Sequence, residues 1–228
     1  MFKKIIEKIK SVDKVLLSFI ISVIFGIFNG VLSILEGSLW FLILAIYFVS
    51  LAIVRGGIVS YQSKHNYNMK ESVQAYKKSG ILLLVMGLTL SFAVYEVVAV
   101  NEGFKYPGIL IYGVGAYTLF KIIGAILYFC KHTGNKDFSK RAVMHINLTD
   151  ALVSILALQT AILNEFATGE TPTIVINIIT GVGVCLYSLI AGVYMILKAN
   201  KTLKNLDGSE KTADTQVIEA IKEREIRK

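Results

Sequence analysis

The sequence predicts an all-α, polytopic membrane protein with six transmembrane helices. Hydrophobic residues make up 54% of the 228 residues and charged residues only 18%, which is more apolar than a soluble domain of this length needs. Apolar runs of about 20 residues recur, and each is long enough to cross a hydrocarbon core of about 30 Å. Basic residues gather in alternate connections between these runs, as they do in membrane proteins.

The chain divides into three regions by its hydropathy pattern. Residues 1–13 place apolar side chains on one face and lysines on the other, which predicts an interfacial helix that Ser11 or Asp13 ends. Residues 14–200 form the six-helix transmembrane domain. Residues 201–228 form a short cytoplasmic tail with a terminal helix. The six spans are expected at about 15–35, 39–61, 79–100, 108–130, 141–164 and 173–198. Residues 60–79 are polar and are expected to be the longest loop.

The distribution of charge predicts the topology. Five lysines precede the first span, and further bases fill the second connection, the fourth connection and the tail. The other three connections together hold one base, Lys105, against four glutamates. This asymmetry predicts a plasma-membrane protein with both termini in the cytoplasm. The chain has no compact basic module, so nucleic acid is excluded as a partner. The lipid bilayer is the expected partner, and a homodimer and a small cation or other small solute stay open.

A single acid, Asp150, lies deep inside the fifth span. Asn147, Asp150 and Ser154 share one helix face because they are spaced at i, i+3 and i+7. The fourth span carries Lys121, at the same depth of roughly 14 Å by residue count. Buried charges in membranes usually have partners. We therefore predict a direct or water-bridged Lys121–Asp150 ion pair, so that losing one partner is worse than losing both.

Other polar residues in the spans are weaker candidates for a site. Tyr47 and Ser50 lie near the middle of the second span, where they are expected to line a pathway with Asp150, Lys121, Asn147 and Ser154. Arg55, nearer the cytoplasmic end, is expected to snorkel to the surface. His65 is expected to be a solvated loop residue, and Gly26 and Gly30 to pack inside the bundle rather than in a dimer. The chain has no phosphate loop, nucleophile motif or paired catalytic acids, so neither an enzyme nor a cofactor is predicted.

Three stretches, taken in order, resemble the cation diffusion facilitator family. GSLWFLILAIYFVSLAIVR is similar to its second span, YEVVAV with Pro107-Gly108 to its third-to-fourth junction, and SKRAVMHINLTDALVSI to its fifth span. The tail NLDGSEKTADTQVIEAI resembles the entry to that family's cytoplasmic domain. The resemblance implies a six-helix bundle with a site for a divalent ion between the second and fifth spans.

The departures from the family are as informative as the resemblance. The positions that match its ligands hold Tyr47 and Leu51 in the second span, and Ile146 and Asp150 in the fifth, so only Asp150 is retained. His145 is one residue away from the ligand position at Ile146, and it lies about 140° around the helix from Asp150. Three functions stay open: a secondary transporter with an altered substrate and no intact tetrahedral divalent-metal site, a non-transporting scaffold or regulatory protein locked by Lys121 and Asp150, and zinc or manganese efflux through His145 and Asp150.

Overall fold

The computed structural model describes residues 2–63, 68–99, 110–134, 137–166 and 170–226. Side chains are described for residues 16–60, 68–96, 111–134, 137–166 and 174–208. The predicted start of the fourth span, at Pro107 and Gly108, lies outside these ranges, as do His65 and the loop glutamate Glu102.

The described residues form six α-helices, and each is long and apolar enough to cross a membrane. This confirms the predicted all-α, six-span membrane bundle. The helices are α1 (Phe2–Glu36), α2 (Leu39–Ser63), α3 (Met69–Ala99), α4 (Leu110–His132), α5 (Phe138–Phe166) and α6 (Glu170–Ile226). Two turns rest on glycines with positive φ, Gly37 between α1 and α2 and Gly134 after α4, a backbone conformation that glycine adopts readily.

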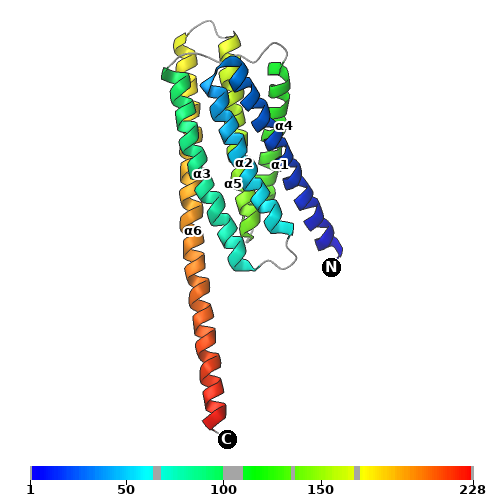
Figure 1. Ribbon diagram of the computed structural model, residues 1–228, viewed down its shortest axis with the longest axis vertical. Coiled ribbons are helices and arrows are strands. Elements are labelled where there is room, and N and C mark those ends of the chain that lie inside the picture. The colour runs from blue at the N-terminus through cyan, green and yellow to red at the C-terminus, as the bar shows by residue number, and fades with distance from the viewer. Residues whose placement is uncertain (1, 64–67, 100–109, 135–136, 167–169, 227–228) are drawn as a thin grey trace.

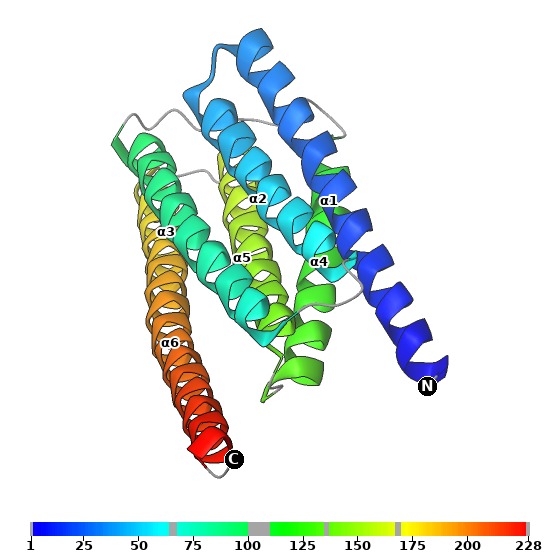
Figure 2. The ribbon, with the colours of Figure 1, turned by 60° about the horizontal axis from the view of Figure 1, so that its bottom comes forward.

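Helix α5 lies inside the bundle and contacts α2, α3, α4 and α6 (Figure 1). The other close backbone contacts between helices join α1 to α2, α2 to α3 and α3 to α6. Figure 2 shows α1 and α4 at one side of the bundle and α6 at the other, with both chain ends projecting from the same end. Because α5 is enclosed on several sides, a charged residue on it needs partners from the neighbouring helices.

Helix α3 begins earlier than predicted. Its first turns, from Met69, cover the second half of the segment that was expected to be a loop. Val73 and Tyr76 are fully buried there, and the Tyr76 ring meets the Phe138 ring edge-on with centroids 5.4 Å apart. The polar residues around them hide this apolar stripe in a hydropathy average, although its i, i+3 spacing is helical.

The two ends of the chain also differ from the prediction. Helix α1 runs without a break past Ser11 and Asp13, and α6 runs without a break through Gly208 to Ile226. A lone glycine inside a helix costs only about 1 kcal/mol and does not by itself end it. Lys70 of α3 forms a salt bridge of 2.6 Å with Asp207, which ties this part of α6 to the bundle.

Glycines allow the two helices to pack closely within each of two pairs, α1 with α2 and α3 with α6. A Cβ atom on Gly26 would lie 3.3 Å from a Val49 methyl, and one on Gly30 would lie 3.9 Å from Ala45. These glycines therefore pack α1 against α2 within the bundle, as predicted. Gly80 and Gly192 do the same for α3 and α6 at closer range, because a Cβ on Gly192 would lie 2.8 Å from the Gly80 carbonyl oxygen.

Gly192→Ala is therefore expected to lower the free energy of unfolding by about 1–3 kcal/mol, since overpacking forces the two backbones apart. Gly183→Ala on the same helix is the matched control, because nothing lies within 4 Å of a Cβ there. Reversible unfolding in mixed detergent micelles measures both. Equal effects of the two substitutions would contradict the close contact of α3 and α6.

Candidate functional site: a buried charge cluster

Asp150 lies in the middle of α5 and is almost completely buried, at 2% exposed. Its Oδ1 atom accepts a hydrogen bond of 2.7 Å from the Lys121 ammonium of α4. The side chains of these two residues are 3% and 10% exposed. The predicted Lys121–Asp150 ion pair is therefore confirmed, and it is direct rather than bridged by water.

Asp150 has a second cationic partner, Arg55 of α2. The Arg55 Nη2 atom lies 2.9 Å from the Asp150 Oδ2 atom, and the arginine side chain is only 7% exposed. The prediction that Arg55 snorkels to the surface is wrong. Helix α2 continues for two further turns to Ser63, and Arg55 faces α1 and α5 instead of the helix end. We call Arg55, Lys121 and Asp150 the charge cluster.

Arg55 also joins α1 to α5. Its Nη1 atom donates hydrogen bonds to the Ser18 carbonyl oxygen, at 3.1 Å, and to the Ser22 hydroxyl of α1. Its Nη2 atom lies 3.3 Å from the Asn147 side-chain oxygen of α5, beside Asp150. A planar guanidinium with several fixed donors suits this role, because it reaches acceptors on two sides at once.

Lys121 is surrounded by one more hydrogen-bond acceptor and three aromatic rings. Its ammonium donates a 3.0 Å hydrogen bond to the Ser154 hydroxyl, which in turn donates to the Asp150 carbonyl oxygen. The nitrogen lies 4.8 Å from the Tyr117 ring centroid, 5.0 Å from that of Phe48 and 5.9 Å from that of Phe25. Aromatic faces attract a cation, and more strongly where water is excluded.

The remaining predicted site residues divide into two groups. Asn147 and Ser154 contact the charge cluster as their shared helix face predicts. Tyr47 is fully buried, and its hydroxyl has no hydrogen-bond partner among the described residues. Ser50 is half-buried and makes no hydrogen bond to the cluster.

His145 points away from Asp150. Its Nδ1 atom lies 3.3 Å from the Tyr187 hydroxyl of α6, and its ring is near Tyr194 of the same helix. His145 lies five positions before Asp150, about 140° away around the helix, so the two side chains leave α5 in different directions. Among the described residues, no three His, Cys, Asp or Glu side chains gather as metal ligands do. In this structure His145 contacts α6 whereas Asp150 contacts Arg55 and Lys121, so the two residues of the alternative metal site do not share a partner.

Zinc and manganese are expected not to bind at the charge cluster with micromolar affinity, because two protein cations already occupy the Asp150 oxygens. Calorimetry on the purified protein measures this. His145→Ala is expected to leave the titration unchanged. Micromolar zinc binding that disappears in His145→Ala or Asp150→Ala would overturn the prediction.

Sequence reasoning missed the part that Arg55 and Ser22 play. Two signals were present in the sequence, and the first is that Arg55 is a charge inside the otherwise apolar second span. Ser22 interrupts the apolar first span. Neither signal states which helix the Arg55 side chain faces.

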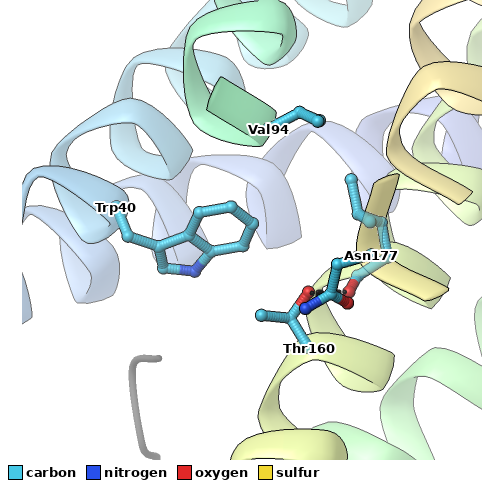
Figure 3. A pocket seen from close by; sticks show the side chains of 5 residues that line it. Trp40, Val94, Thr160 and Asn177 are labelled. Atoms are coloured by element: carbon cyan, nitrogen blue, oxygen red, sulfur yellow. Dashed lines mark hydrogen bonds between the residues drawn. The ribbon is translucent and has the colours of Figure 1, made fainter. Parts of the chain in front are cut away.

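A small gap lies apart from the cluster, between α2, α3, α5 and α6 (Figure 3). Trp40, Val94, Leu156, Thr160 and Asn177 line it, and the space is too narrow for a water molecule. The Thr160 hydroxyl and the Asn177 side-chain oxygen are 3.2 Å apart and hydrogen-bonded. The gap therefore offers no free polar group from this pair and is a packing defect rather than a site.

Comparison with known proteins adds no family. No protein-family model matches the chain, and searches of the curated proteins and of the solved structures find no match either.

Proposed function

We propose that this membrane protein is a secondary transporter whose substrate path passes the charge cluster. The observation that carries the proposal is the meeting of Arg55, Lys121 and Asp150, from three different helices, on one buried carboxylate. Ionisable side chains inside the membrane are costly and mark substrate, ion or proton pathways by default. Apolar side chains would hold the helices together at least as well, so the cluster is better explained by transport than by stability.

The substrate differs from the divalent ion of the cation diffusion facilitator family that the sequence resembles. Two protein cations take the place beside Asp150 where the family's ion would lie, and Tyr47 and Leu51 stand at two of its ligand positions. Imidazole, thiolate and carboxylate are the usual protein ligands of zinc, and neither of these side chains supplies one. The chain is accordingly proposed as a diverged relative, with transport that depends on breaking and remaking the contacts of Asp150.

A second function is favoured by the closure of the cluster. Both carboxylate oxygens of Asp150 are bonded to cations, and the side chain is 3% exposed. A bundle locked in this way would serve as a scaffold or regulatory partner. The two functions differ in whether the cluster ever becomes accessible to water.

Cysteine labelling in proteoliposomes tests this difference. The two free cysteines of the chain, Cys130 and Cys185, are first replaced by alanine, and Ser154→Cys is then introduced beside Lys121. A membrane-impermeant thiol reagent is added to one side at a time. A transporter is expected to expose residue 154 slowly to both sides, whereas a locked scaffold exposes it to neither. Ser188→Cys, buried between α3 and α6, is the control that stays unlabelled in both cases.

We further propose that both termini lie in the cytoplasm at the plasma membrane, from the asymmetry of basic residues between alternate connections. In intact cells, an impermeant reagent is expected to label cysteines placed at Gly103 and Gly169 and to miss those placed at Lys70 and Gly134. The reverse pattern would contradict this orientation. Gly103 and Gly169 themselves lie outside the described residues.

A further inference from the structure

The charge cluster carries one positive charge in excess. It contains two cations, Arg55 and Lys121, and one carboxylate, Asp150. No second Asp or Glu side chain in the described part of the chain forms a salt bridge with either cation. An uncompensated charge inside a membrane is unfavourable, so a further negative charge at this place would be stabilising.

The cluster also has unused hydrogen-bond donors. The Lys121 ammonium carries three N–H groups, and its hydrogen bonds to Asp150 and Ser154 use two of them. Outside the cluster, Tyr47 on the same helix as Arg55 adds a hydroxyl that is buried without any partner among the described side chains. Donors left unused beside an excess positive charge are what an anion requires.

The surroundings select the size and charge of that anion. Phe25, Phe48 and Tyr117 surround the lysine nitrogen within 6 Å, and the side chains of the cluster are at most 10% exposed. A single charge neutralises the excess, whereas a divalent anion would reverse it. Divalent cations are repelled by the same excess.

We propose that the charge cluster binds one small monovalent anion of halide size beside Lys121, and that such anions are the substrate class of the transporter. This second part rests on the proposed transport function. When the anion binds, Lys121 shifts part of its hydrogen bonding from Asp150 to the anion, which loosens the contact between α4 and α5. No covalent or redox step is involved.

Thermal unfolding of the detergent-purified chain tests the binding. Chloride, bromide or nitrate replaces gluconate at constant ionic strength and constant sodium concentration. The wild-type chain is expected to show a saturable rise in melting temperature with each small anion and none with sulfate. Lys121→Met leaves a neutral Arg55–Asp150 pair, and it is expected to lose the saturable rise. Lys198→Met removes a cation whose ammonium contacts Tyr194 of α6 and not the charge cluster, and it is expected to keep the rise.

A saturable rise that Lys121→Met retains, or no rise in the wild type, overturns the proposal. If Lys121→Met does not fold, Lys121→Gln replaces it, because a neutral amide keeps a donor for Asp150. Chloride uptake into proteoliposomes separates binding from transport. A saturable rise without uptake supports the anion site and refutes transport, whereas labelling of Ser154→Cys from both sides without any rise refutes the anion and leaves transport of another solute.

Discussion

Asp150→Asn is expected to lower the free energy of unfolding by about 3–5 kcal/mol, the usual cost of removing one partner from a buried ion pair. The substitution leaves Arg55 and Lys121 inside the bundle without a carboxylate, at distances where their charges repel. Reversible unfolding in mixed micelles measures the loss. Asp207→Asn is the matched control, because its salt bridge with Lys70 is 36–52% exposed and exposed pairs contribute only about 0–1 kcal/mol.

Substitutions of the three residues in the charge cluster are not expected to lower the stability equally. From the sequence, Lys121→Met and Asp150→Asn are both expected to be destabilising, with partial recovery in the double mutant. Arg55 changes this expectation, because Lys121→Met leaves a neutral Arg55–Asp150 pair and its loss is therefore smaller than that of Asp150→Asn. The double mutant still holds Arg55 without an anionic partner, so it recovers only part of the loss of Asp150→Asn and is expected to be less stable than Lys121→Met, contrary to the expectation from the sequence that losing one partner is always worse than losing both. If Asp150→Asn were no worse than Asp207→Asn, the cluster would not be the buried ion pair described here.

Arg55→Lys is expected to lower the free energy of unfolding by at least about 1.5–3 kcal/mol, the contribution of one hydrogen bond to a charged group. The guanidinium reaches Ser18 and Ser22 on α1 as well as Asn147 and Asp150 on α5. A lysine ammonium is a single point of charge and does not reach both sides. The substitution is therefore expected to free α1 while the net charge of the cluster stays the same.

Hydrogen exchange of the α1 amides measures this separately from global stability. In Arg55→Lys, exchange is expected to speed up around Ser18 and Ser22 more than in α6. Arg141→Lys is the matched control, since Arg141 contributes one long hydrogen bond of 3.4 Å to the Tyr194 hydroxyl. Unchanged exchange in α1 would contradict the role of Arg55 as the link between α1 and α5.

The sequence contains enough to place Lys121 and Asp150 together. Each is a charge in an otherwise apolar span, each sits on a polar or small helix face, and consecutive helices are usually neighbours. The same reasoning places Asn147 and Ser154 beside Asp150, because their spacing along one helix is independent of the rest of the fold. These expectations depend on local periodicity and on the cost of charge in lipid.

The error at Arg55 has a different origin. A cation near the end of a span can avoid the cost of a charge in lipid either by snorkelling to the surface or by pairing with an acid, and the sequence does not say which. The choice depends on where α2 ends and on how it is rotated against α1 and α5. Both are properties of packing between helices, which the hydropathy of one helix does not contain.

What the sequence alone determined about this protein is its class, its six spans and the identity of the buried acid, since each follows from a run of residues or a spacing within one helix. Only the tertiary structure decided that two cations share that acid, that His145 faces α6, and that α3 and α6 continue as helices past the expected loop and tail boundaries. These facts depend on the rotation and offset of one helix against another, which are set by close contacts such as Gly80 against Gly192. The excess positive charge of the cluster, on which the proposed anion site rests, follows from that packing.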